Sequence, residues 1–231
     1  MLVNTVTPKD LSWWWWQPWA NTLAYYKFNW NLTDETWNST ASAIWTITYA
    51  SVWDGQSIIK SPNNCVFTSV SESMFGSAFT ISIWVQFSTV KSLMRLAWWC
   101  TNNNAGTGYA NIQYEGWFWW LQFYNDWDRT SWSWTPTANT WYNIIITWWW
   151  TNNDLKACVN WVDLTKTLSN YSYNTDNSTV ALWGNQNYKS MVLWYESYDW
   201  YLDECILEDK EWTTTEKLDY FDLTKSKHGI S

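Results

Sequence analysis

Residues 77–88 alternate between apolar and polar side chains with a period of two, the pattern of a β-strand with two different faces. One face of this predicted strand carries Phe79, Ile81, Ile83, Val85 and Phe87, and the other carries Thr80, Ser82, Trp84 and Gln86. We expect the apolar face to lie against the hydrophobic core.

Residues 139–164 have the order of two strands joined by a polar break at residues 151–154. The second strand ends at Asn160-Trp161, between two apolar runs. An Asn at such a site predicts a hairpin turn whose next residue is Gly, because that position adopts a positive φ. Trp161 stands there instead, and its Cβ makes this backbone conformation costly.

Further short strands are predicted by the same patterns, with turn residues between them. They cover residues 23–28, 44–49, 57–60, 65–70, 93–97, 109–114, 121–124, 180–182, 191–194 and 201–207. Thr213 and Glu216 form a capping box that starts a short helix ending near Phe221. The prediction is an all-β, two-sheet antiparallel β-sandwich with a short C-terminal helix. Residues 1–22 are expected to be a flexible linker, residues 23–225 the domain, and residues 226–231 a frayed tail that includes His228.

Tryptophan occupies many positions that favour glycine. The chain has 27 Trp and only 7 Gly in 231 residues, whereas glycine usually makes up about 7% of a protein. The tryptophans at turn positions follow or precede Asn, Asp or Thr, as at Trp30, Trp37, Trp127, Trp161 and Trp200.

We therefore hypothesise that most tryptophans stand for glycine, except Trp84, Trp141 and Trp212. The simplest cause is the codon UGA, which some bacterial lineages translate as glycine and others as tryptophan. The hypothesis predicts that the turn tryptophans are exposed or held at positive φ, and that Trp84 and Trp141 are packed. The alternative is a genuinely tryptophan-rich binding protein, in which case exposed runs of indoles would favour aggregation.

Net charge and cysteine spacing exclude several classes of protein. The formal net charge of −8 and the pI near 4.5 argue against nucleic acid and anionic lipid as partners. The four cysteines are widely spaced and lack a C-x-x-C pair, so a zinc site is poorly supported. Either two disulfides or buried free thiols fit the cysteine pattern. No membrane-inserting run is evident once the tryptophans are discounted, and we expect any export signal to lie outside this sequence.

Five segments, taken in order, resemble the laminin-G-like branch of the concanavalin A-like lectin/glucanase jelly rolls, especially the bacterial surface and secreted versions. The segments are residues 23–34, 79–85, 140–147, 155–162 and 200–207. In that family the positions of Trp30, Trp161 and Trp200 are typically Gly, whereas those of Trp84 and Trp141 are typically Trp. The resemblance implies a concanavalin A-like jelly roll over roughly residues 23–221.

Calcium is the ion that the resemblance implies, at the rim of the sandwich. Ca²⁺ binds six to eight oxygen ligands, and Asp54 and Asp203 are the acidic residues we expect to supply them. A turn-capping Asp54 and a strand-end Asp203 are the simpler explanations. A sugar site is expected at Asn102, Asn103, Tyr109, Tyr124 and Asn125, where rings and amides combine, although an Asn-rich solvated loop explains the same residues.

Catalysis is not expected. A jelly-roll glucanase needs two carboxylates on one face of a strand, and adjacent residues such as Asp203 and Glu204 point to opposite faces. The expected function is non-catalytic recognition of glycans, or adhesion to a cell-surface protein, by a monomeric module of a larger secreted or surface-displayed protein. The alternatives are a structural protein–protein module and, as a remote second, a glycoside hydrolase.

Overall fold

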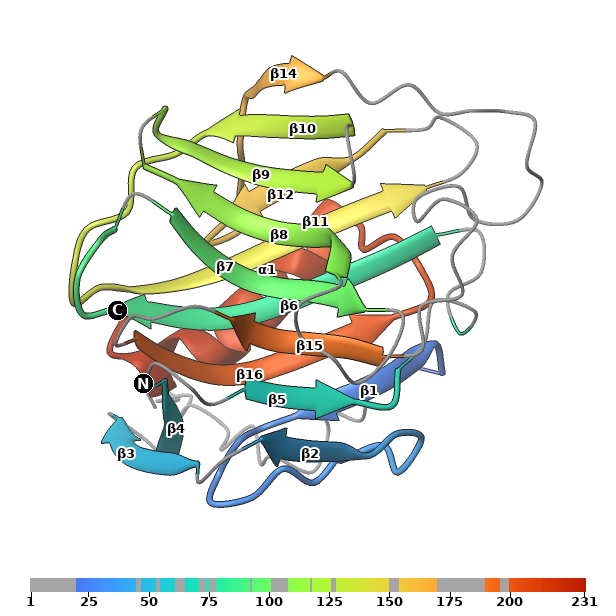
Figure 1. Ribbon diagram of the computed structural model, residues 1–231, viewed down its shortest axis with the longest axis vertical. Helices are drawn as coiled ribbons and strands as arrows, with labels where there is room; N and C mark the ends of the chain where they lie inside the picture. The colour runs from blue at the N-terminus through green and yellow to red at the C-terminus, as the bar shows by residue number, and fades with distance from the viewer. Residues whose placement is uncertain are drawn as a thin grey trace, which may run out of the picture.

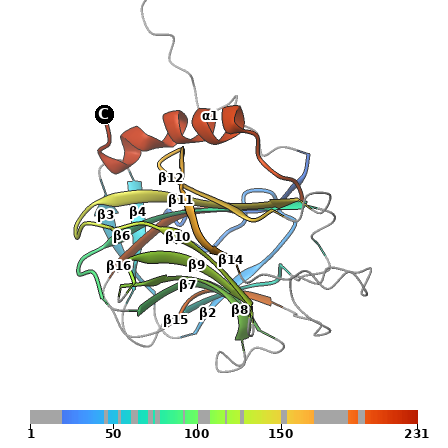
Figure 2. The same ribbon diagram turned by 90° about the horizontal axis from the view of Figure 1, so that it is seen from above.

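The computed structural model describes residues 20–44, 47–52, 55–60, 65–70, 74, 78–91, 93–100, 108–116, 118–125, 128–149, 154–169, 190–195 and 200–231. These residues form two eight-stranded antiparallel sheets that lie face to face (Figure 1). Helix α1 (Thr214–Thr224) lies against the outer face of the first sheet, on the side away from the second sheet (Figure 2). This architecture confirms the predicted sandwich with a short C-terminal helix.

The two sheets draw their strands from all parts of the chain. The first sheet has the order β13 (Val162–Asp163), β12 (Lys156–Val159), β11 (Trp141–Trp149), β6 (Ala78–Phe87), β16 (Trp200–Glu208), β4 (Gly55–Lys60) and β3 (Thr48–Val52), and β1 (Thr22–Tyr26) also pairs with β16. The second sheet has the order β14 (Lys166–Ser169), β10 (Asp128–Ser133), β9 (Trp120–Asn125), β8 (Gly108–Glu115), β7 (Leu93–Cys100), β15 (Ser190–Tyr195), β5 (Cys65–Thr68) and β2 (Ala41–Ile44).

Most of the predicted strands exist, with some differences. The strand predicted over residues 44–49 is two strands in different sheets, because β2 ends at Ile44 and β3 begins at Thr48. Strands β10 and β14 were not predicted, since their short polar sequences lack alternation. The strand predicted at residues 180–182 lies outside the described residues. In that described part, no helix is long and apolar enough to cross a membrane.

Strand β6 lies at the centre of the first sheet, between β11 and β16. Its apolar face, from Phe79 to Phe87, is buried in the core between the sheets, as predicted. Its other face is also buried: Thr80, Ser82 and Trp84 have no more than 1% of their surface exposed. The C-terminal segment covers this second face, so both faces of β6 exclude water.

The C-terminal helix begins as predicted and ends later. Thr213 Oγ1 accepts a hydrogen bond from Glu216 N at 3.2 Å, and Glu216 Oε2 accepts one from Thr213 N at 2.8 Å. The helix continues to Thr224 and is followed by the 3-10 helix η2 (Lys225–His228). The prediction that residues 226–231 fray is wrong for Lys227 and His228, which are buried against the first sheet.

Three of the predicted turn tryptophans, Trp30, Trp37 and Trp161, have the backbone geometry predicted for them, and Trp119, which was not among the predicted turns, has it as well. Trp30, Trp37, Trp119 and Trp161 have φ between 57° and 66°, and their exposed fractions range from 44% to 83%. Trp84 and Trp141 are buried, also as predicted, and Trp212 is buried as well. Several other tryptophans lie in strands or in the hydrophobic core. Trp200 opens strand β16 rather than a turn, and Trp132, Trp134 and Trp148 are buried in the core.

Candidate functional site

A β-bulge in β16 places two acidic side chains beneath the C-terminal helix. Asp203 pairs with Trp84 of β6, but the next paired residue of β16 is Cys205, which leaves Glu204 as the extra residue. Glu204 has a φ of 39°, and the bulge turns its side chain to the same side as that of Asp203. The expectation that these adjacent residues point to opposite faces is therefore wrong.

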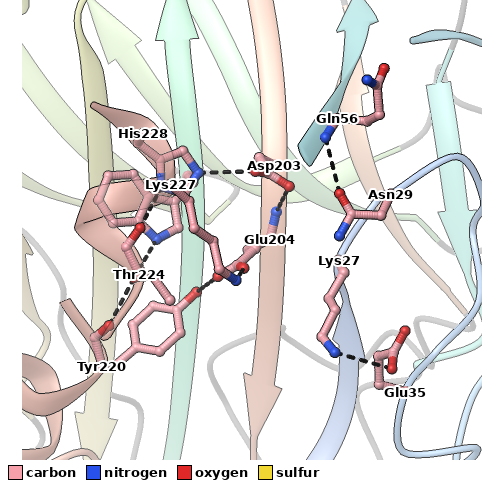
Figure 3. Close-up of polar contacts among 11 residues, drawn as sticks. Lys27, Asn29, Glu35, Gln56, Asp203, Glu204, Tyr220, Thr224, Lys227 and His228 are labelled. Atoms are coloured by element: carbon pink, nitrogen blue, oxygen red, sulfur yellow. Dashed lines mark hydrogen bonds and ion pairs between the residues drawn. The ribbon is translucent and has the colours of Figure 1, made fainter. Parts of the chain in front are cut away.

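Both carboxylates are paired with side chains of the C-terminal segment. Asp203 Oδ2 lies 3.0 Å from His228 Nε2, and Asp203 Oδ1 accepts a hydrogen bond from the Glu204 amide at 2.9 Å. Glu204 Oε1 forms an ion pair with Lys227, and Glu204 Oε2 accepts a hydrogen bond from Tyr220 at 3.0 Å. Figure 3 shows these side chains pointing toward one another from α1, η2 and β16.

Burial changes the proton affinity of this cluster. Loss of hydration raises the pKa of Asp203 to about 6, while its contact with His228 acts in the opposite direction. Burial also raises the pKa of Tyr220 well above its usual value, and nearby Glu204 adds to that effect. All these groups are closed off from solvent, so the cluster joins the C-terminal segment to the sheet and is not open to a substrate.

This geometry provides no set of ligands for the predicted calcium site. Both oxygens of Asp203 already have protein partners, and Asp54 lies outside the described residues. Within the ranges that the structure describes, no group of three or more His, Cys, Asp or Glu side chains could hold a metal ion. Calcium binding stays a prediction.

Cys158 and Cys205 are free thiols in buried positions. Burial raises the pKa of Cys158 to about 12 and raises that of Cys205 further. Both thiols are therefore held protonated and unreactive at neutral pH.

A cavity of about 670 Å³ lies beside the start of α1, at the end of the first sheet that carries β12 and β13. Its lining comes from several elements and consists of Ala78, Lys156, Asp163, Asp209, Lys210, Glu211, Trp212, Thr213, Thr214 and Lys217. A volume of this size is within the range of small-ligand sites. No sequence signal points to this site, because its residues are brought together by the pairing of β12 with β13 and by the position of the helix.

Two ion pairs form part of the cavity lining. Lys156 Nζ lies 2.7 Å from Glu211 Oε1, and Lys217 Nζ lies 2.9 Å from Asp163 Oδ1. The Lys217 side chain is buried, whereas that of Asp163 is 59% exposed. The hydrogen bond with Glu211 raises the pKa of Lys156, so this ammonium group remains charged at neutral pH. The cavity therefore offers both hydrogen-bond donors and acceptors to a polar ligand.

The structure brings part of the predicted sugar surface together. Tyr109 lies in β8, and Tyr124 and Asn125 lie in the adjacent strand β9, where Asn111 pairs with Tyr124. Asn102 and Asn103 lie outside the described residues. The three described positions are thus at one end of two paired strands of the second sheet.

Comparison with known proteins connects the fold to solved structures. No family model matches the chain, and no curated protein matches its sequence. One similar structure is domain 4 of AbnA, a GH43 extracellular arabinanase from Geobacillus stearothermophilus, solved in complex with arabinotriose. The TM-score is 0.64 and the sequence identity is 16%. The match covers 86% of this chain and 97% of that domain.

Two larger proteins contain a similar structure. Botulinum neurotoxin type C, which interacts with two ganglioside molecules when it enters cells, gives a TM-score of 0.63 and 14% identity over 88% of this chain. Trypanosoma rangeli sialidase gives a TM-score of 0.66 and 11% sequence identity over 90% of this chain. The match spans about half of the neurotoxin chain, at 51%, and 33% of the sialidase chain. The chain has the jelly-roll β-sandwich fold that these proteins share.

Proposed function

We propose that this protein is a non-catalytic glycan-recognition module that binds a sugar in the cavity beside α1. The observation that carries the proposal is the lining of that cavity, where ammonium, carboxylate and hydroxyl groups converge. Sugar hydroxyls both donate and accept hydrogen bonds, so a lining of both kinds suits them. Support comes from the similar fold of domain 4 of AbnA, which was solved with arabinotriose.

A glycan array, followed by calorimetry with the best ligand, tests this proposal. Lys156→Gln and Asp163→Asn should each weaken binding at least tenfold, since charge-assisted hydrogen bonds are the stronger ones. Lys166→Gln is the matched control, because Lys166 forms a similar surface ion pair with Asp154 but does not line the cavity. If the well-folded protein bound no glycan on the array, the proposal would be overturned and a protein–protein module would be favoured.

The absence of catalysis is part of the proposal. Asp203 and Glu204 share one face of β16, but their carboxylates are already paired with His228 and Lys227. A glycosidase needs carboxylates that reach the scissile bond. Release of reducing sugar by the purified protein, abolished by a single Asp or Glu substitution, would contradict this part.

We further propose that the chain is a laminin-G-like module of a secreted or surface-displayed protein. It is supported by the five motifs in order and by the sandwich that they form. Adhesion through a glycan or a surface protein is the role that we propose for such a module. Calcium at Asp54 or Asp203, and sugar contacts at Asn102, Asn103, Tyr109, Tyr124 and Asn125, remain parts of the same proposal.

We also propose that glycine, not tryptophan, is the natural residue at the turn positions. The positive φ of Trp30, Trp37, Trp119 and Trp161 supports it, because side chains with a Cβ avoid this region. We propose that the natural protein has glycine at these four positions, through the alternative translation of UGA.

A further inference from the structure

The ion pair of Lys227 with Glu204 lies in an aromatic environment that excludes water. The Lys227 side chain is 7% exposed and that of Glu204 is 2% exposed. Trp84, Tyr220 and Phe221 belong to the hydrophobic cluster between the first sheet and the C-terminal segment, where this pair is buried. Taking two charges out of water is costly, and their mutual attraction offsets that cost only where the geometry is good. A reaction that removed both charges would therefore stabilise the fold.

The two side chains carry the functional groups of an amide bond and are held in contact. Lys227 Nζ is paired with Glu204 Oε1, which places the nitrogen beside the carboxyl carbon Cδ. Each partner is fixed by its own element, because Glu204 is the extra residue of the bulge in β16 and Lys227 lies in η2. Two reactants held in this way can reach an effective concentration of about 10⁵–10⁸ M. Exclusion of water also protects the product from hydrolysis.

Two neighbouring groups suit the chemistry of amide formation. The Tyr220 hydroxyl donates a hydrogen bond to Glu204 Oε2 at 3.0 Å, so it can stabilise the negative charge that develops on this oxygen when an amine attacks. Asp203 lies on the same side of β16 and is acted on by the charges of Glu204 and Lys227. Burial raises the pKa of Asp203 to about 6, so this carboxyl group can accept and release a proton near neutral pH.

We propose that Lys227 and Glu204 condense into an isopeptide bond, which covalently joins the C-terminal segment to strand β16. One proton moves from the Lys227 ammonium to the Glu204 carboxylate, and the neutral amine nitrogen then forms a bond with Glu204 Cδ. Asp203 takes a second proton from this nitrogen and gives it to the hydroxyl group on Cδ. The bond between Cδ and that oxygen breaks, and one water molecule leaves. The reaction is a dehydration and needs no oxidant or cofactor.

Two other ion pairs of lysine with a carboxylate are in a different environment and serve as internal controls. Lys217 Nζ lies 2.9 Å from Asp163 Oδ1, but the Asp163 side chain is 59% exposed. Lys156 Nζ lies 2.7 Å from Glu211 Oε1, and the Lys156 side chain is 40% exposed. Water reaches one partner of each pair and keeps its charge solvated. We therefore expect both of these pairs to remain ionic.

Mass spectrometry of the full chain, purified in the folded state and then denatured, tests the proposal. The intact mass should be lower than the sequence mass by one water molecule. Tryptic digestion should give a branched peptide in which residues 190–210 are joined to residues 226–231, without cleavage after Lys227. The full sequence mass together with ordinary cleavage after Lys227 would overturn the proposal. A branched peptide through Lys217 or Lys156 would overturn the assignment to the buried pair.

Lys227→Arg is the matched control, because it keeps the positive charge beside Glu204 but replaces the amine with a guanidinium that stays protonated. This variant should have the full sequence mass, and loss of water from it would overturn the proposal. Glu204→Gln should lose ammonia in place of water, since its side-chain amide releases nitrogen when the lysine attacks.

Asp203→Asn and Asp203→Glu test the proton transfer, with near-ultraviolet circular dichroism to establish that each variant is folded. Asp203→Asn should leave Lys227 and Glu204 unlinked, because an amide does not carry the proton, whereas Asp203→Glu should restore the link. A folded Asp203→Asn protein that is fully linked would overturn the role of Asp203. These outcomes do not depend on glycan binding, so the proposed function is tested separately.

Discussion

His228 Nε2 lies 3.0 Å from Asp203 Oδ2, and the same imidazole stacks on Trp84 with ring centroids 3.9 Å apart. His228 Nδ1 lies 2.9 Å from the Thr224 carbonyl, which can only accept, so Nδ1 carries a proton. The contact with Asp203 then requires one more proton, either on Nε2 or on the carboxyl group. This shared proton ties the end of the chain to the middle of the first sheet.

Asp203 should make the protein more stable as the pH falls toward 4. Its folded-state pKa of about 6 lies above its ordinary value of 3.8, so the folded state binds the proton more tightly than the unfolded state does. The resulting stability is fully present below the unfolded pKa and is lost as the pH rises through about 6. Glu204, Lys227 and His228 face the same carboxyl group.

Urea unfolding of the wild type and of Asp203→Asn at pH 5, 6 and 7.5 measures this effect. The free energy of unfolding of the wild type should rise relative to the variant as the pH falls. A difference that stays constant, or that changes in the opposite direction, would contradict the raised pKa.

Lys227→Met should be strongly destabilising. It leaves the carboxylate of Glu204 buried without its ion-pair partner, which typically costs about 3–5 kcal/mol. The double variant Glu204→Gln, Lys227→Met should recover part of that loss, since it buries no unpaired charge. Chemical denaturation of the four proteins of this cycle gives the coupling free energy, and additive effects would count against the pair.

Removal of residues 226–231 should lower the free energy of unfolding by several kcal/mol. The deletion takes away the buried side chains of Lys227 and His228 and exposes the Trp84 ring. A frayed tail would leave the stability unchanged. Thermal unfolding followed by tryptophan fluorescence distinguishes these outcomes.

Glycine should stabilise the protein at the exposed turn tryptophans. Trp30→Gly, Trp37→Gly and Trp161→Gly each relieve a left-handed backbone that costs a residue with a Cβ about 1–2 kcal/mol. Phe28→Gly is the control, because Phe28 also has a positive φ of 56° but its ring is fully buried. That variant should lose stability. Equal effects of all four substitutions in urea unfolding would argue against backbone strain as the cause.

Peptide mass spectrometry of the protein from its native source tests the glycine proposal directly. We expect glycine masses at positions 30, 37, 119 and 161, and tryptophan masses at positions 84, 141 and 212. Tryptophan at the turn positions would mean that the exposed rings are real. They would then be candidates for the binding surface in place of the cavity.

Much of the fold could be predicted because its signals are local. The two faces of β6 follow from alternation along one strand, and the capping box of Thr213 and Glu216 spans a single helical turn. The sites could not be predicted in the same way. Lys156 and Lys217 line one cavity, yet they are far apart in the sequence and carry no shared pattern.

The sequence by itself determined the class of fold, the core face of the central strand, the start of the helix and the turns where tryptophan conflicts with the backbone. Each depends on neighbours a few residues away, through side-chain alternation, capping or the sterics of φ. Only the tertiary structure decided that Glu204 turns to the side of Asp203, that His228 is buried, and that Lys227 reaches Glu204. These depend on which strands pair and in what register, and strand pairing joins residues that are distant in the chain.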